Sequence, residues 1–154
     1  MNLYLQFLRY SVDLDGYGNI SFDGTFDAER LKSAGRLASQ VLQVKQLELT
    51  AGEGYVANPH GAQCVVERVI LYVREGDAGK TIRVGVGETP TEDVDNLIDD
   101  LSLASVGLFS NLDSPGTNGK AAALWEADEY IVFNASAVTT AEITAFVYYH
   151  TTGV

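Results

Sequence analysis

Hydrophobic and polar residues alternate along CVVERVILYVREGDAGKTIRVGVGE, the segment from Cys64 to Glu88. The side chains expected on the apolar face of its first half are Val65, Val69, Leu71 and Val73, with Arg68 and Arg74 opposite; those of its second half are Ile82, Val84 and Val86. A period of two over this length predicts two β-strands with one face in a core. The Gly-rich turn between them predicts a sandwich hairpin.

The same alternation returns at the C-terminus, between Ala141 and Thr151. One face there carries Ile143, Ala145, Val147 and Tyr149, and the other carries Thr144, Phe146, Tyr148 and His150. Shorter strands are expected at 44–50, 101–103, 107–109 and 130–135. Strands at spacings of about eight to twelve residues predict an all-β fold, an antiparallel β-sandwich of the jelly-roll type, over residues 64–154.

Residues 1–50 differ from this domain, and they predict an N-terminal arm or attachment segment. Between Leu3 and Val12 both alternating faces are apolar, which indicates either a central strand or an arm covered by another subunit. The next stretch, DAERLKSAGRLASQVLQ, places apolar residues on one face of a short helix, although Gly35 weakens it. Residues 51–63 are rich in Gly, Asn and Pro and predict a loop before the sandwich.

Composition narrows the classes of protein. The chain has 154 residues, 46% of them hydrophobic, which fits one folded domain with an added arm. Its formal charge of −11 leaves no basic track for nucleic acid and disfavours anionic membranes. The single cysteine, Cys64, cannot form a disulfide within the chain. MNLYLQFLRY is too short to span a membrane and has no features of a secretory signal, so we expect synthesis in a host cytoplasm.

Three patterns along the chain are candidates for sites of chemistry. EGDAGKT lacks the glycine spacing of a phosphate-binding loop and precedes a strand, and DLDGYGN fails as a calcium loop at Tyr17 and Gly24. Seven acids without a base between residues 88 and 113 could bind a divalent ion, but a solvated acidic loop is preferred. These acids are Glu88, Glu92, Asp93, Asp95, Asp99, Asp100 and Asp113.

Histidine and cysteine complete the search for reactive groups. His60 and His150 are the only histidines, and they lack the partner spacing of a zinc site. His60 and Cys64 stand four residues apart, where nothing fixes them as a nucleophile and its base. We therefore predict no catalytic, cofactor-binding or metal-binding residues, and a protein that is not an enzyme.

An aromatic face is the remaining candidate. Phe146, Tyr148 and His150 project together from the last strand, and Trp125 could join them. Such stripes bind sugars in some β-sandwich modules and form subunit contacts in others. Assembly is favoured because the apolar N-terminal segment also needs a cover.

The order of segments over residues 64–152 resembles small jelly-roll proteins of tailed-bacteriophage heads, namely decoration, cement and head-fibre proteins. The segments that carry the resemblance are ERVILYV, TIRVGVGE, DNLIDDLSLASVGLFSNLD, GTNGKA, an acidic turn and ITAFVYYH. It implies a structural virion protein on the outer head surface, a homotrimer bound to the major capsid protein, with residues 1–45 in attachment. The alternatives are a tail, neck or baseplate component, and a carbohydrate-binding module using Trp125 and the terminal tyrosines.

Overall fold

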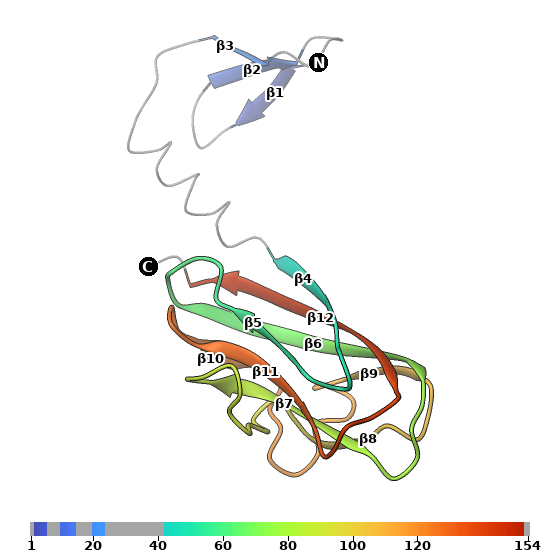
Figure 1. Cartoon of the computed structure of the whole chain (residues 1–154). Helices are drawn as coiled ribbons and strands as arrows, with labels where there is room; N and C mark the ends of the chain where they lie inside the picture. Colours follow the sequence, from blue (N-terminus) through green and yellow to red (C-terminus); the bar gives the residue numbers. More distant parts are fainter. Residues whose placement is uncertain (1, 6–9, 15–19, 24–41, 153–154) are drawn as a thin grey trace. The chain divides into compact units, whose positions relative to one another are not determined.

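The computed structural model describes residues 2–5, 10–14, 20–23 and 42–152, in two compact units within 1–40 and 41–152 (Figure 1). The first unit contains β1 (Asn2–Leu5), β2 (Tyr10–Leu14) and β3 (Ile20–Asp23), paired antiparallel in that order. The helix predicted over 27–43 lies outside the described residues except at its end, where Gln43 begins a strand. The described residues contain no helix.

The second unit is an antiparallel β-sandwich, which confirms the predicted all-β fold. Its strands are β4 (Gln43–Glu48), β5 (Gly54–Ala57), β6 (Cys64–Glu75), β7 (Thr81–Gly87), β8 (Ile98–Ser102), β9 (Gly107–Ser110), β10 (Ala123–Trp125), β11 (Tyr130–Ala135) and β12 (Glu142–Thr151). In the β6 sheet, β4, β12 and β6 pair in that order, and both β9 and β10 pair with the far edge of β6. The β7 sheet has the order β5-β11-β7-β8.

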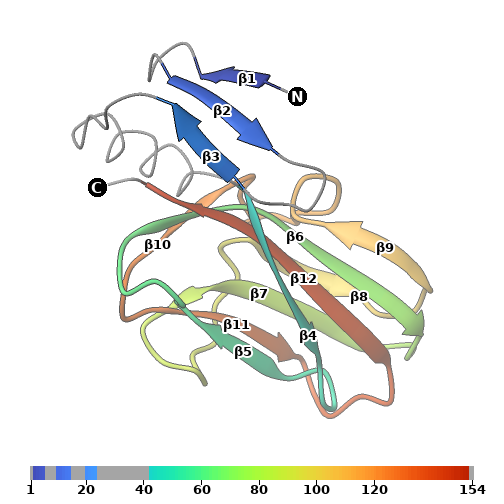
Figure 2. The ribbon, with the colours of Figure 1, turned by 90° about the horizontal axis from the view of Figure 1, so that it is seen from above.

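The chain passes repeatedly from one sheet to the other, as Figures 1 and 2 show. The first sandwich strand, β4, pairs with the last, β12, and β5 pairs with β11. Interleaving of this kind is the strand arrangement of a jelly roll. It also means that β4 and β5 belong to the sandwich, although the sequence placed them in the attachment segment and in the 51–63 loop. Each of them pairs with a strand that is distant in sequence, and the local turn residues do not indicate this pairing.

The predicted hairpin of 64–88 is wrong, because β6 and β7 lie in different sheets. β6 pairs with β12, β9 and β10, whereas β7 pairs with β11 and β8. The connection arches over one end of the sandwich, where Asp77 N–H donates to Leu103 O at 2.8 Å. The link from β11 to β12 is a second arch. Both strands of an arch turn an apolar face inward, so alternation alone cannot distinguish an arch from a hairpin.

A β-bulge in β6 changes which of its residues face the core, compared with the strict alternation predicted from the sequence. Val69, Leu71 and Val73 are buried as predicted, but Val65 is only half-buried and lies on the outer side. The register of β6 against β12 shifts between Tyr148 and Tyr149. Strict alternation from Val69 would have turned Glu67 inward, and the extra residue of the bulge keeps this carboxylate exposed.

Candidate functional site

The outer side of the β6 sheet is an apolar surface, which we call the open face. Its residues are Val44 of β4, Phe146 and Tyr148 of β12, Ile70 and Tyr72 of β6, and Leu108 of β9. The strand register brings them together, since Phe146 lies opposite Ile70, and Tyr72 lies opposite Leu108. Leu108 is 70% exposed and Tyr72 is 43% exposed. Exposed apolar side chains gathered in this way are typical of interaction sites, so the open face is a candidate for one.

A histidine–carboxylate contact and an ion pair lie at the two ends of the open face. His150 Nδ1 is 3.2 Å from Glu67 Oε1 at one end. At the other end, Arg74 Nη2 is 2.8 Å from Glu48 Oε2 and 3.9 Å from Glu142 Oε2. An apolar centre with a polar rim is the usual anatomy of a protein interface.

Arg68 is the one charged residue within the open face. It lines two shallow pockets, of about 190 Å³ beside Leu108 and about 350 Å³ beside Leu42 and Tyr148. Its Nε is the only buried side-chain donor without a hydrogen-bond partner among the described residues. A buried donor left unpaired costs free energy, so this nitrogen does not contribute a stabilising hydrogen bond to the open face.

The outer side of the β7 sheet is different, because residues 88–97 fold over it; we call them the covering loop. A Cβ on Gly85 would lie 2.8 Å from Val94 Cβ and 3.0 Å from Asn96 N, so the loop rests directly on the sheet. Asn96 extends the sheet as a strand would: its Oδ1 accepts from Val86 N–H at 2.8 Å and its Nδ2 donates to Val86 O at 3.1 Å. Val132, which faces outward, is completely buried.

Arg83 fixes the covering loop electrostatically. Its Nη1 lies 2.8 Å from Asp93 Oδ2, and its Nε lies 2.8 Å from Asp100 Oδ1. The hydrogen bond from Arg83 lowers the pKa of Asp100 below its ordinary value. Asn134 adds a bond from its Nδ2 to Glu92 O at 2.6 Å.

A groove runs along β11 beside the tip of the covering loop. Its first part, about 520 Å³, is lined by Glu53, Tyr55, Pro90, Thr91 and Asn134, among others. Its second part, about 330 Å³, shares Thr91 and Asn134 and continues to Arg83, Asp93 and Ser136. Tyr55 is 53% exposed, and its ring meets Tyr130 edge to face with centroids 5.7 Å apart.

The acids predicted as a possible cation site are dispersed, and most accept hydrogen bonds from the protein itself. Arg83 holds Asp93 and Asp100, and Glu92 accepts from the N–H of Glu88 at 2.6 Å. Asn118 donates to Asp95 and Asp99, and Ser110 donates to Asp113. Over residues 42–152 no three acidic, histidine or cysteine side chains gather in a way that could hold a metal ion.

His60 and Cys64 are not arranged as base and nucleophile. His60 Nε2 lies 3.1 Å from Gln43 Oε1, and the Cys64 thiol points to Asn58 Oδ1 and Ala62 O. Cys64 is completely buried, and this burial raises its pKa, which disfavours the reactive thiolate. Cys64 therefore packs in the core, and His60 lies at the surface.

Trp125 does not join the aromatic surface. It is 0% exposed, its Nε1 donates to Glu129 O at 2.9 Å, and its ring meets Tyr149 edge to face in the interior. Phe146, Tyr148 and His150 do project together as predicted, from the outer side of β12. The residues missed in the sequence are Ile70, Tyr72 and Leu108. Ile70 and Tyr72 alternate with buried Val69 and Leu71 in β6. The sequence of this strand therefore already showed apolar residues on both of its faces.

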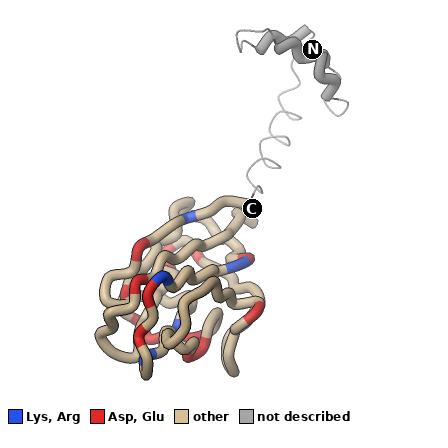
Figure 3. The backbone as a smooth tube through the Cα atoms, turned by 90° about the vertical axis from the view of Figure 1, so that its right-hand side faces the viewer, with Lys and Arg blue, Asp and Glu red and all other residues tan. Residues whose placement is uncertain are grey.

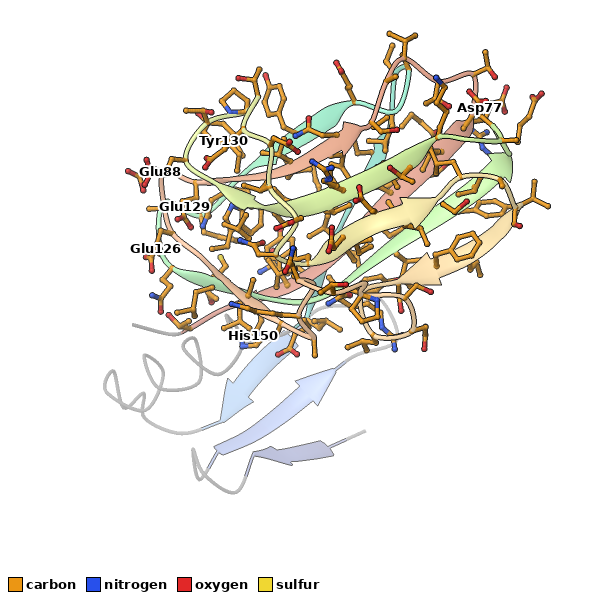
Figure 4. All side chains as sticks on the ribbon, turned by 90° about the horizontal axis from the view of Figure 1, so that it is seen from below. Asp77, Glu88, Glu126, Glu129, Tyr130 and His150 are labelled. Atoms are coloured by element: carbon orange, nitrogen blue, oxygen red, sulfur yellow. The ribbon has the colours of Figure 1, made fainter. Side chains whose placement is uncertain are left out.

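The turn that resembles a phosphate-binding loop is structural. Asp77 Oδ2 accepts hydrogen bonds from Thr140 N–H at 3.0 Å and from the Thr139 hydroxyl at 2.8 Å, and these bonds lower the pKa of Asp77. In Figure 4 Asp77 lies at the end of the sandwich opposite Glu88, Glu126 and Glu129. Of the stretch DLDGYGN, which fails as a calcium loop, Asp13 lies in β2, and residues 15–19 and 24 are outside the described residues.

Comparison with known proteins gives no relative. No family model matches the chain, and searches of curated proteins and of solved structures found no match. Within the described part of the chain, no helix has the length and apolar character needed to cross a membrane.

Proposed function

We propose that this protein is a structural virion protein that decorates or cements the outer head of a tailed phage as an oligomer, with the open face buried between copies. The observation that supports it is the apolar, exposed surface of Tyr72, Leu108 and their neighbours on a strongly acidic chain. The order of sequence segments in residues 64–152, which resembles head-decoration proteins, supports the location on a phage head.

The charge distribution favours a second copy as the occupant of the open face. Two chains of formal charge −11 repel each other unless they meet where charge is low. The strands of the open face carry both signs of charge, whereas the covering loop and its neighbours carry acids without a base between residues 88 and 113. The charged residues of these strands are Lys45, Arg68 and Arg74 against Glu48, Glu67, Glu75 and Glu142. Acidic positions are red in Figure 3.

The edges of the sandwich favour contact through a face. At the β4 edge, Lys45 lies opposite buried Val147 and is itself exposed. A lysine on the interior side of an edge strand opposes pairing with a strand of another molecule, which is a common protection against edge-to-edge association. Burial of the open face would contribute about 25 cal/mol per Å² of apolar surface before the costs of association are subtracted.

Attachment to the major capsid protein is assigned to the N-terminal segment. The resemblance gives this role to residues 1–45. Because β4 belongs to the sandwich and the first compact unit ends at residue 40, we assign attachment to residues 1–40. A chain that begins at residue 41 should lose binding to purified heads while the full chain retains it. Full occupancy by the shortened chain would contradict this assignment.

Electron microscopy of particles made by the genome that encodes the chain tests the location. An antibody against the full protein should label the outer head surface. Label on the tail, neck or baseplate would favour that alternative, which shares the same sequence features. Particles that carry no label and no copy of the chain by mass spectrometry would contradict a virion role.

A further inference from the structure

We propose that the groove beside the covering loop binds a neutral oligosaccharide, with Tyr55 as its stacking platform. This site goes beyond the proposed structural role and lies on the opposite sheet from the open face. It is also different from the sugar site expected from Trp125, whose ring is buried.

The size and construction of the groove fit a small-molecule site. Its two parts, about 520 Å³ and about 330 Å³, share Thr91 and Asn134, so they are continuous. The groove walls are held in place: Asn96 and Asn134 fix the covering loop to β7 and β11 through bonds of 3.1 Å or less. A preformed wall reduces the ordering cost of binding.

Tyr55 provides the apolar contact that a sugar ring requires. Half of its surface is free, and the edge-to-face contact with Tyr130 fixes the orientation of the phenol ring. The axial C–H groups of a pyranose pack against an aromatic face in the same way as other apolar groups. Pro90, across the same pocket, adds a second apolar surface.

Polar groups along the rest of the groove match hydroxyls. Thr91 and Glu53 make no hydrogen bond with their side chains in the described structure, and Asn134 uses its amide nitrogen for Glu92, which leaves its carbonyl oxygen as an acceptor. Ser136 Oγ accepts from Thr81 N–H at 3.1 Å and can still donate. Such alternation of donors and acceptors beside an aromatic ring suits a ligand with several hydroxyls and one apolar face.

Charge excludes the acidic ligands. Arg83 is the only cation that lines the groove, and Asp93 and Asp100 already hold it. Glu53 and Asp93 make the lining net negative, so phosphate, sulfate, sialic acid and uronic acid groups would be repelled. A neutral oligosaccharide remains as the ligand class that fits.

A glycan array that contains neutral, sialylated and sulfated oligosaccharides tests this site with the full chain. We expect neutral glycans to be retained, and Tyr55→Ala should lower the affinity of the best one about tenfold in solution titration. Thr91→Val, which removes a free hydroxyl at nearly constant shape, should lower it about threefold. Val106→Ala, at a 63% exposed position in the β8–β9 turn outside both surfaces, should leave the affinity unchanged.

Three results would overturn the proposal. They are the absence of neutral-glycan binding on the array and in saturation-transfer NMR, a preference for sulfated or sialylated glycans, and equal affinity of the Tyr55→Ala variant. If the protein is monomeric in solution but still binds neutral glycans, only the proposed structural role is contradicted. The two proposals can therefore fail independently.

Discussion

The two outer faces of the sandwich have similar strands beneath them but different covers. The β7 sheet turns Gly85, Gly87 and Val132 outward, and residues 88–97 of the same chain fold over them. The β6 sheet turns Ile70, Tyr72 and Phe146 outward, and no comparable loop within residues 42–152 lies on them. One sheet is therefore completed by its own chain, and the other has the composition of a surface completed by another molecule.

The difference can be traced to particular residues. Glycines on β7 let the backbone of the covering loop approach closely, and a polar side chain, Asn96, continues the hydrogen bonding of the sheet. The open face instead carries large apolar side chains, with an ion pair and a histidine–carboxylate contact at its ends. Small residues on a sheet let a loop of the same chain pack closely against it. Large exposed apolar residues instead offer surface area for contact with another molecule.

The largest effect is expected where the covering loop touches the sheet. Gly85→Val should lower the free energy of unfolding by about 3 kcal/mol, because its side chain would meet the backbone N of Asn96 and the side chain of Val94. Chemical denaturation measures it. Ala57→Val, an exposed position on β5 of the same sheet, is the control and should change stability by less than about 0.5 kcal/mol. Equal effects of the two would contradict a loop packed on Gly85.

A smaller loss is expected for Asn96→Ala. This change leaves Val86 N–H and C=O without their partner, which should cost about 2 kcal/mol and increase amide exchange at Val86. Asn118→Ala is the matched control, since Asn118 is exposed and the change removes only the hydrogen bond from its Nδ2 to Asp95 Oδ2, which leaves the bonds to Val86 in place. Unchanged exchange at Val86 in the first variant would show that the loop is held by other contacts.

The next effect in size is expected in acid, which should destabilise the contacts that hold the covering loop on the β7 sheet. Arg83 lowers the pKa of Asp100, so this carboxylate contributes stability that is complete above its unfolded value, about pH 4, and is lost as the pH falls through the lower folded value. Arg83→Gln should therefore flatten the dependence of unfolding free energy on pH in this acidic range. Glu48→Gln, on the opposite sheet, is the comparison. If Arg83→Gln leaves the dependence of unfolding free energy on pH unchanged, the ion pairs of Arg83 do not cause the loss of stability in acid.

The smallest effect on folding is expected on the open face. Leu108→Ser should change the stability of the isolated chain by less than about 0.5 kcal/mol, because its side chain is already 70% exposed. Assembly should nevertheless make the unmodified protein more stable at higher protein concentration, and the variant should lose this dependence. Thermal unfolding across a range of concentrations separates the two. A dependence that persists in the variant would place the contact elsewhere.

Much of the sandwich could be predicted from the sequence, because alternation in 64–75, 81–87 and 142–151 reflects burial on one side. The pairing of those strands could not, since an arch and a hairpin share the same pattern. Trp125 was a candidate for the aromatic surface and lies in the core, because a three-residue strand gives too few positions to assign a face. The open face requires strands that are distant in sequence, so only the fold brings Tyr72 and Leu108 together.

The most direct test of the central claim is the solution mass of the full chain by analytical ultracentrifugation, compared with a Tyr72→Glu, Leu108→Glu double variant. The open face predicts an oligomer for the unmodified protein and a folded monomer for the variant. A monomer at every concentration, or an identical oligomer in both proteins, would contradict assembly through this face.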